Sequence, residues 1–413
     1  MRGCPSPHIL LSGFPQAGGG VAGRRVFFLF PSSEIPPAGR IAGRMVFPFS
    51  YPARLLFPSP FSGPMSWHCR IGVMGVIIED LEACGLSGRF YGGRAGRKIG
   101  IAWRGADWLV KFPGPTGRLE GGVRPSAVVP VSEWLGSHVY GLLDIPVHET
   151  VLGVRDGRIV CACKDFADRD HVLVDFHDLK NSLSDAEPGF VSSPSAGSCL
   201  VLADVVAAIG RIPVLRGIPG VSDRFWDMFV IDAFTGRCSR DNTDWGVLRG
   251  PGMRFTLAPV YANGDPSGDR RTGSWMRRRV ADRDLIRQDA LDVRSCYVTD
   301  TGHPIAPLKY MASGEDPACT RALARFMDRF DPARFDRLLG SIPSSALGLT
   351  VVPDGFHEYH RQVTAARYRE FTRIWKSLSP AVAMPGNPTA VLLPAPFPDA
   401  GPSPSPRVEG PGL

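Results

Sequence analysis

Residues 108–113 read Trp108-Leu109-Val110-Lys111-Phe112-Pro113, which places one lysine inside an otherwise apolar strand. Burying an ammonium group without a counter-charge is costly, so Lys111 must meet a carboxylate or an anionic ligand. Glu133, on the next segment with helical periodicity, is the natural partner. The sequence therefore predicts an ion pair between Lys111 on a strand and Glu133 on a helix.

Lysine is rare in this chain, which has six Lys against 41 Arg. Three of the six, Lys98, Lys111 and Lys164, fall within the strand-rich part of the sequence. A lysine ammonium is a compact point charge on a flexible stem, and it fits a phosphate oxygen in a narrow cleft where a planar guanidinium does not. These lysines are therefore candidates for binding an anion, and the alternative is that they are ordinary surface residues.

A glycine-rich segment from Tyr91 to Lys98 precedes one of the strands and contains Gly92, Gly93 and Gly96. Glycine lets backbone N–H groups approach an anion closely, so the segment is a candidate phosphate cradle. Its spacing matches neither the P-loop nor the dinucleotide-binding fingerprint, and a plain hairpin turn is the alternative.

The periodicity of the sequence changes along the chain. Short β-prone runs separated by Gly-rich turns occupy residues 71–166, with one helical pattern, and after residue 198 the patterns are mostly helical. This order predicts an α+β, two-lobed fold with a β-rich N-lobe at 65–168, a mostly helical C-lobe at 169–382 and a cleft between them. The strand runs are 99–103, 108–112, 151–154 and 158–163, and the helical runs are 132–143, 200–209, 223–234, 283–293, 318–339 and 357–378.

Both ends of the chain differ in composition from the middle. Residues 1–64 are rich in Pro, Gly and Phe, lack Lys and show no sustained periodicity. We expect them to be a disordered extension or the result of a start assigned too early, with Met65 as the true start. Residues 383–413, with Pro at nearly every third position, are expected to be a disordered tail.

The overall composition is that of an ordinary globular protein, with 44% hydrophobic and 21% charged residues. No apolar run approaches the ~18 residues that a membrane helix requires, and residues 1–64 carry +5 of the net charge of +7. We therefore expect neither a membrane nor nucleic acid as a direct partner. Nine scattered cysteines without a CxxC pair predict a cytoplasmic location. Cys161 and Cys163 are expected to be small buried residues, because the sequence offers no further metal ligands nearby.

Eight motifs recur in one order and together resemble the HipA-like kinase family in its short, single-chain bacterial form. Each motif alone is weak, and the ordered series is what makes the resemblance specific. It extends from about Arg89 to Leu378. The motifs are YGGRAGRKIGI (91–101), WLVKFP (108–113), SEWLGSHVYGLLDIPVHETVLG (132–153), VCACKDF (160–166), RFWDMFVIDAFTG (224–236), DNTDWGVL (241–248), LAPVYANG (257–264) and SCYVTDTGHPIAPLKY (295–310).

The resemblance implies a protein-kinase-like fold with ATP and Mg²⁺ between the lobes. Lys111 would reach the nucleotide phosphates and Glu133 would hold it, as in other kinases. Family members phosphorylate serine or threonine on protein targets, often themselves included, and some are toxins restrained by a DNA-binding antitoxin. The resemblance thus implies a protein substrate or a regulatory protein partner, and an antitoxin-like partner. The hinge beside the adenine would be formed by Ala162, Cys163, Lys164 and Asp165.

The loop at residues 236–246 departs from the family pattern. Active relatives read like G-N-x-D-R-H-x-x-N-W-G, and this chain reads GRCSRDNTDWG with no change in length. Ser239 takes the place of the Asp that accepts the proton of the substrate hydroxyl, Asp241 replaces the His, and Asp244 replaces the metal-binding Asn. A serine hydroxyl is not basic near neutral pH, and loss of a general base costs about 10²- to 10⁴-fold in rate. Asp244 keeps an oxygen ligand for Mg²⁺.

The second metal motif of the family, L-A-P-x-Y-D-N-G, also departs. Ala262 stands where the resemblance implies the Asp that joins Mg²⁺ to the nucleotide, and its methyl group has no oxygen to offer. Asp265, three residues on, would need a rearranged loop to replace it.

These departures favour a pseudokinase or a very slow kinase that still binds ATP through Lys111 and acts by binding or regulation. The alternative is a working ATP-dependent Ser/Thr kinase, in which Asp241 serves as the base and Asp244 holds a single metal ion. A third interpretation keeps the scaffold alone, without nucleotide or catalysis. In that case Asp241 and Asp244 belong to a solvated loop with Arg240 as a partner.

Overall fold

The computed structural model describes residues 75–92, 96–114, 128–186, 198–264 and 272–382. The chain divides into two units, residues 1–64 and 65–413, and all described residues belong to the second. The expectations for residues 1–64, for residues 383–413 and for Gly93 and Asp265 lie outside the described residues. Within the described part, no helix is both long enough and apolar enough to cross a membrane.

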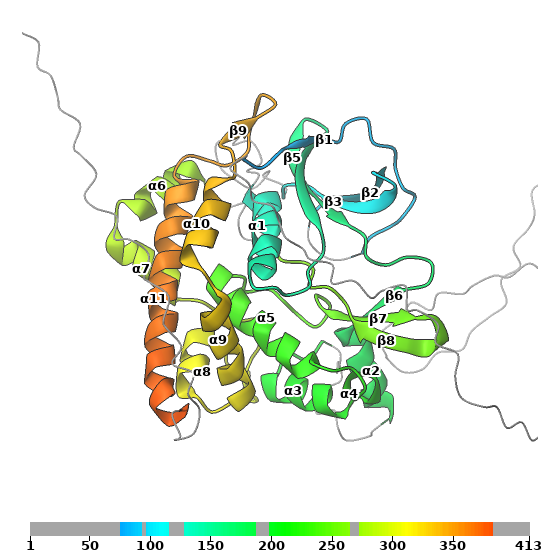
Figure 1. Cartoon of the computed structure of the whole chain (residues 1–413), viewed down its shortest axis with the longest axis vertical. Coiled ribbons are helices and arrows are strands. Elements are labelled where there is room, and N and C mark those ends of the chain that lie inside the picture. Colours follow the sequence, from blue (N-terminus) through cyan, green and yellow to red (C-terminus); the bar gives the residue numbers. More distant parts are fainter. Residues whose placement is uncertain (1–74, 93–95, 115–127, 187–197, 265–271, 383–413) are drawn as a thin grey trace, which may run out of the picture. The chain divides into compact units, whose positions relative to one another are not determined.

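A mixed sheet and one helix form the first lobe (Figure 1). The strands lie in the order β1-β4-β5-β3-β2, and β1 pairs with β4 in parallel whereas the other neighbours are antiparallel. The helix packs against β4 and β5. These elements are β1 (Glu79–Asp80), β2 (Lys98–Trp103), β3 (Ala106–Lys111), α1 (Val128–Leu142), β4 (Thr150–Arg155) and β5 (Arg158–Lys164).

Two tight hairpins set the register of this sheet. Arg104-Gly105 joins β2 to β3, Asp156-Gly157 joins β4 to β5, and all four residues have positive φ between 50° and 72°. Two-residue loops of this kind have a twist that matches the flanking strands. The register that results places Lys98 directly opposite Lys111, so both side chains leave the same face of the sheet.

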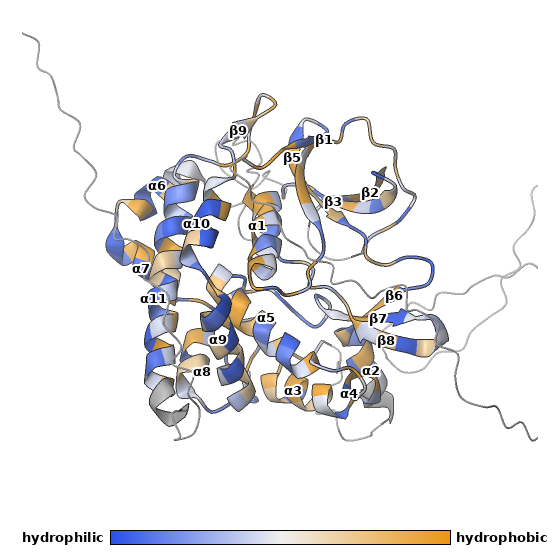
Figure 2. Ribbon diagram, viewed as in Figure 1, coloured by the Kyte–Doolittle hydropathy of each residue, from blue (hydrophilic) through white to orange (hydrophobic). Residues whose placement is uncertain are grey.

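The second lobe is mostly helical and carries a small sheet in the order β6-β7-β8. Its central helix is α5, which packs against α3, α8, α9 and α11. Apolar residues concentrate on α3 and α1 and on the strands β3 and β5 (Figure 2). The elements are β6 (Val172–Asp175), α2 (Phe176–Ala186), α3 (Leu202–Arg211), α4 (Pro213–Arg216), α5 (Val221–Thr235), β7 (Gly246–Gly250), η1 (Pro251–Met253), β8 (Arg254–Leu257), α6 (Gly273–Val280), α7 (Arg283–Leu291), α8 (Pro307–Ser313), α9 (Pro317–Arg329), α10 (Pro332–Gly340), β9 (Ser345–Ala346), β10 (Leu349–Thr350) and α11 (Phe356–Val382).

The predicted α+β fold class, with a strand-rich lobe followed by a helical lobe, is confirmed. The single helix predicted at 318–339 is wrong, because the chain forms α9 and α10 with a break between them. Pro332 has no N–H to donate and disfavours helical geometry at the preceding residue. Asp331 instead has an extended backbone, and its side chain accepts the N–H of Ala333 as an N-cap.

Arg367 on α11 ties together the ends of two other helices. Its buried guanidinium donates to the carbonyls of Ala290 at 3.0 Å, of Asp289 at 2.9 Å and of Phe234. The last carbonyls of a helix carry partial negative charge, so they suit a buried cation. α11 thereby fixes the end of α5, from which the chain passes directly into loop 236–245.

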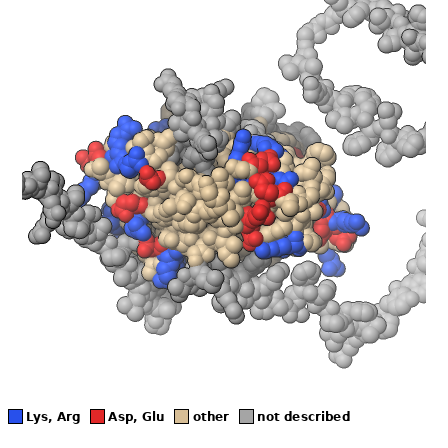
Figure 3. Space-filling model, turned by 90° about the horizontal axis from the view of Figure 1, so that it is seen from above, with Lys and Arg blue, Asp and Glu red and all other residues tan. Residues whose placement is uncertain are grey.

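Figure 3 shows the molecule from above. On this face, Lys and Arg lie beside Asp and Glu, and they border a broad uncharged area. This distribution agrees with a chain whose charge beyond residue 64 is nearly balanced.

Candidate active site

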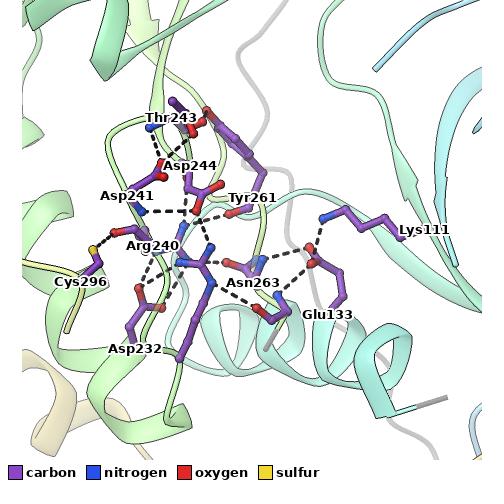
Figure 4. A network of polar contacts seen from close by, with 12 residues as sticks. Lys111, Glu133, Asp232, Arg240, Asp241, Thr243, Asp244, Tyr261, Asn263 and Cys296 are labelled. Carbon is purple, nitrogen blue, oxygen red and sulfur yellow. Dashed lines mark hydrogen bonds and ion pairs between the residues drawn. The ribbon is translucent and has the colours of Figure 1, made fainter. Parts of the chain in front are cut away.

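The predicted ion pair between Lys111 and Glu133 is present. Nζ of Lys111 lies 2.8 Å from Oε2 of Glu133, and the two side chains are 19% and 5% exposed (Figure 4). Burial lowers the pKa of Lys111, but the Glu133 charge outweighs it and raises this pKa above its usual value. Burial likewise opposes ionisation of Glu133, and Lys111 holds its pKa well below the usual range. Both groups are therefore charged at neutral pH.

Glu133 also holds the loop that follows β8. Its Oε1 accepts the N–H of Asn263 at 2.9 Å, and its Oε2 accepts the N–H of Gly264 at 2.8 Å. A Cβ at position 264 would lie 2.8 Å from Oε2, and a Cβ on Gly136 would lie 2.5 Å from the Asn263 carbonyl oxygen. Glycine at these two positions therefore allows α1 and loop 258–264 to approach this closely.

His148 joins this cluster, although nothing in the sequence singles it out. Its Nε2 lies 3.2 Å from Oε1 of Glu133 and 3.1 Å from Oγ of Ser137. The Ser137 hydroxyl already donates to the carbonyl of Glu133, so it accepts from His148, and Nε2 carries the hydrogen. Burial lowers the pKa of His148, which is consistent with a neutral ring.

The structure also brings Cys163 next to Glu133 and His148, so that one ligand atom of each lies within 4.8 Å of the others. These three residues do not fit a metal ion. Both oxygens of Glu133 already accept two polar contacts each, and Nε2 of His148 is engaged by Ser137 and Glu133, so these atoms are used within the protein. The expectation that Cys161 and Cys163 are small buried residues agrees with their exposures, which are 0% and 1%.

Lys98 lies across from Lys111 and adds positive charge to the same face. Its Nζ donates to the Gly92 carbonyl at 2.9 Å. Burial, and then the charge of Lys111, lowers the pKa of Lys98. Like charges placed opposite each other on neighbouring strands are destabilising unless an anion lies near them. Gly92 and Gly96 are exposed beside this pair of lysines, and Gly96 has a φ of 62°.

The hinge predicted at Ala162, Cys163, Lys164 and Asp165 lies where β5 ends, and its role beside an adenine stays a prediction. The first three of these residues belong to β5, and Ala162 and Cys163 pair with both β3 and β4. The N–H of Lys164 donates to Glu149 O, and its ammonium lies 3.1 Å from a Glu149 carboxylate oxygen. The connection between the lobes therefore begins at Asp165.

Asp165 is held by the segment that leads into the glycine-rich loop. Its carboxylate accepts the Tyr91 hydroxyl at 2.8 Å and lies 3.3 Å from a guanidinium nitrogen of Arg89. Next to it, Phe166 packs against Tyr261 of loop 258–264, with ring centroids 5.6 Å apart. The residue that leaves β5 thus contacts the start of the glycine-rich segment, and its neighbour contacts the helical lobe.

Loop 236–245 carries Ser239, Asp241 and Asp244, all of them partly exposed. It begins at Gly236, whose φ of 81° ends α5. Oδ1 of Asp241 accepts the N–H of Thr243 at 2.8 Å and the Thr243 hydroxyl at 2.6 Å. This local turn fixes Asp241 relative to its own loop.

Arg240 is not the side-chain partner of Asp241 or Asp244 that the sequence suggests. Its buried guanidinium pairs with Asp232 on α5, and it donates to Oδ1 of Asn263 at 2.7 Å and to the Tyr261 carbonyl at 2.9 Å (Figure 4). Its only contact with Asp244 among the described residues is to the backbone carbonyl, at 3.0 Å. Arg240 therefore connects loop 236–245 to loop 258–264.

The carboxylate of Asp244 pairs with Arg237 instead. NH2 of Arg237 donates to Oδ2 of Asp244 at 2.8 Å, and the N–H of Asp241 reaches the same oxygen at 3.3 Å. The Arg237 side chain is only 4% exposed, and that of Asp244 is 25% exposed. Neither Arg237 nor Asp232 stands out in the sequence as a neighbour of this carboxylate.

The described residues do not fit Mg²⁺ at this place. Mg²⁺ requires six oxygen ligands, of which one or two are carboxylates. The side chain of Ala262 has no carboxylate. Oδ2 of Asp244 accepts a hydrogen bond from Arg237, and the Asn263 side-chain oxygen accepts one from Arg240. The role of Asp244 as a metal ligand therefore stays a prediction.

The chain is similar to proteins of known activity. It is 29% identical over 265 residues to the serine/threonine-protein kinase CtkA of Helicobacter pylori, covering 61% of this chain and 75% of that protein. The crystal structure of a Helicobacter pylori proinflammatory kinase CtkA matches 73% of this chain and 98% of its own, with a TM-score of 0.61 and 23% identity. A HipA–HipB–operator DNA complex from Shewanella oneidensis matches with a TM-score of 0.40 and 11% identity, covering 70% of this chain and 67% of its own. No family model matches the chain.

Proposed function

We propose that the chain, as a member of the HipA-like serine/threonine kinase family, binds ATP but transfers phosphate slowly or not at all, and that it acts by binding or regulation. The observation that carries the proposal is the Lys111–Glu133 pair with Lys98 opposite it. The ammonium groups of Lys98 and Lys111 lie on one face of the sheet, and Glu133 is the only carboxylate paired with them among the described residues. An excess of positive charge on this face suits an anionic ligand. The Gly92 and Gly96 backbone borders the same place.

ATP would supply the phosphoryl group, and the residues of this chain would position its phosphates. Lys111 keeps its charge because Glu133 stabilises it, and Glu133 is in turn fixed by two backbone N–H groups. A positioned lysine of this kind orients the nucleotide but moves no proton. Binding can therefore persist when transfer is impaired.

Slow transfer follows from loop 236–245. The acceptor hydroxyl must lose its proton as the phosphorus–oxygen bond forms, and a neutral serine hydroxyl at position 239 is too weakly basic to take it. The loss of a base costs about 10²- to 10⁴-fold, and the missing carboxylate at Ala262 adds to this. The proposal is therefore a pseudokinase or a very slow kinase.

A working serine/threonine kinase is the alternative. The observation that favours it is the partly exposed carboxylate of Asp241, two residues from Ser239 and held in a fixed direction by Thr243. In this case Asp241 would accept the proton, and Asp244 would have to leave Arg237 to hold a metal ion. A third function, a scaffold without nucleotide, would leave Lys98 and Lys111 without an anionic partner other than Glu133.

A thermal-shift titration with ATP, with and without Mg²⁺, tests the proposal. Ligand that binds only the folded state raises the melting temperature. We expect a rise for the wild type, none for Lys111→Ala, and a wild-type response from Lys309→Ala, which removes an exposed lysine on α8. If the melting temperature of the wild type does not rise, the third interpretation, a scaffold that binds no nucleotide, is supported.

Radiolabel transfer to the protein itself, or to a generic protein acceptor, separates slow from efficient kinases. We expect a very low rate that Lys111→Ala reduces further. A brisk rate that depends on Mg²⁺ and on Asp241 would support the alternative. The assay uses the full chain, so the acceptor serine or threonine is found by mapping the label.

The partners and the location are part of the same proposal. A protein substrate or regulatory protein is the partner that the family resemblance supports, and an antitoxin-like DNA-binding partner rests on that resemblance alone. A cytoplasmic location is supported by the scattered cysteines of the sequence, which contain no CxxC pair.

A further inference from the structure

Arg237 occupies the place between the two loops where the resemblance implies a metal ion. Its NH2 contacts Oδ2 of Asp244 at 2.8 Å, its Nε contacts the Gly264 carbonyl at 3.3 Å, and its NH1 lies 3.6 Å from Oδ2 of Asp232. One guanidinium thus connects α5, loop 236–245 and loop 258–264.

The carboxylates around Arg237 already have cationic partners. Lys111, Arg237 and Arg240 pair with Glu133, Asp232 and Asp244, and Lys98 adds a further positive charge near Asp244 and Glu133. A divalent ion at Asp244 would add two positive charges beside a buried guanidinium, and Ala262 supplies no carboxylate to offset them. Coulomb repulsion is strong at such separations where little water screens it. The site is therefore electrostatically complete without a metal.

We propose that the Arg237 guanidinium takes the place of the divalent cation, so that the site holds no resident metal and accepts nucleotide without one. The absence of a resident metal depends on this chain's residues alone. The binding of nucleotide without a metal rests on the proposed function, because it requires that ATP binds. Arg237 acts here as a positioning residue that joins the loops, since its burial keeps it from direct contact with a ligand in the cleft.

The competing explanation is that Arg237 only stabilises the fold. That explanation predicts lower stability when Arg237 is replaced, but no new affinity for a metal. The proposal predicts a gain, because removal of the guanidinium frees Oδ2 of Asp244 and leaves an uncompensated negative charge. A gain of metal binding by a variant that is shown to be folded is not explained by a loss of stability.

The test is a titration of the full chain with Mn²⁺ alone, followed by electron paramagnetic resonance of the free ion and without nucleotide. We expect weak binding by the wild type, and at least about tenfold tighter binding by Arg237→Asn, because a like charge has been removed. Arg237→Lys keeps the charge and should behave like the wild type. Arg237→Asn with Asp244→Asn should lose the gain.

Tight Mn²⁺ binding by the wild type, equal to that of Arg237→Asn, would overturn the proposal. So would a folded Arg237→Asn protein, verified by circular dichroism, that binds Mn²⁺ no better than the wild type. If Arg237→Asn does not fold, the test is a comparison of the Mn²⁺ affinities of the wild type and Ala262→Asp. Ala262→Asp adds the missing carboxylate and should bind Mn²⁺ more tightly than the wild type, and equal affinities would contradict the charge argument.

A second measurement concerns nucleotide. The ATP-induced rise in melting temperature of the wild type should be the same in EDTA as in excess Mg²⁺, whereas that of Arg237→Asn should depend on Mg²⁺. A wild-type response that requires Mg²⁺ contradicts the inference. If ATP has no effect under either condition, the proposed function fails while the Mn²⁺ titration still decides the role of Arg237.

Discussion

Oε2 of Glu133 accepts the N–H of Gly264 at the same 2.8 Å at which it meets the ammonium of Lys111. One carboxylate oxygen therefore joins the strand lysine, the helix α1 and loop 258–264. The position of Lys111 and the position of this loop are not independent, because both depend on a single side chain.

Glu133→Gln should destabilise the protein strongly. It leaves the buried Lys111 ammonium without a counter-charge, and removing one partner of a buried pair costs about 3–5 kcal/mol. Urea unfolding followed by tryptophan fluorescence measures the change. Glu149→Gln, which breaks the exposed pair with Lys164, should cost less than about 1 kcal/mol. If both variants lose the same free energy of unfolding, the buried Lys111–Glu133 pair contributes no more to stability than the exposed Lys164–Glu149 pair.

Gly136→Ala should destabilise the protein by about 1–3 kcal/mol through overpacking. The new Cβ would lie 2.5 Å from the Asn263 carbonyl oxygen, so loop 258–264 must move away from α1. Gly141→Ala on the same helix is the matched control, because its Cβ would meet nothing within 4 Å. Alanine there should be neutral or stabilising by about 0.5 kcal/mol. Melting temperatures of the two variants check both expectations.

Stability should fall in mild acid because of His138 on α1. Its Nδ1 lies 2.8 Å from the Trp134 carbonyl, and burial lowers its pKa to about 4. The unfolded chain then binds the proton more readily, so stability is lost as the pH drops below about 6.5 and levels off below the folded value. Between about pH 7.5 and about pH 5 the wild type should lose about 1–2 kcal/mol more than His138→Gln. Parallel losses in urea titrations at the two pH values would contradict this account.

Ser239→Asp combined with Ala262→Asp should raise phosphoryl transfer by about 10²-fold or more, because it restores a base and a carboxylate. Position 262 has a φ of 55°, a conformation that aspartate adopts more readily than alanine. Radiolabel transfer measures the rate, and adding Lys111→Ala should abolish the gain. An unchanged rate in a folded double variant would show that these two positions do not limit the reaction.

The sequence predicts those features whose cause is local or is a strong energetic cost. The pair of Lys111 with Glu133 is predicted because a lysine in an apolar strand needs a carboxylate. The lobes are predicted because strand and helix periodicities differ. The break at Pro332 was missed because apolar residues keep their helical spacing across it, and the rule for proline has to be weighed against that pattern.

Other parts of the site depend on contacts that no spacing reveals. His148 reaches Glu133 from the connection before β4, and Arg237 pairs with Asp244 across a loop without periodicity. A signal was present in one case, since Arg237 and Asp244 both replace the Asn residues of the family pattern and have opposite charges. Two such changes in one loop indicate a pair, provided that they are considered together.

The hydrogen bonds of Arg367 give α11 an influence beyond packing. The guanidinium holds the last carbonyls of α5, and a Cβ at Gly236 would lie 3.2 Å from it. If a partner bound to α11 and displaced it, the Arg367 hydrogen bonds would transmit this displacement first to the end of α5. A displacement of α11 is therefore expected to shift Gly236, and with it the start of the loop that carries Ser239.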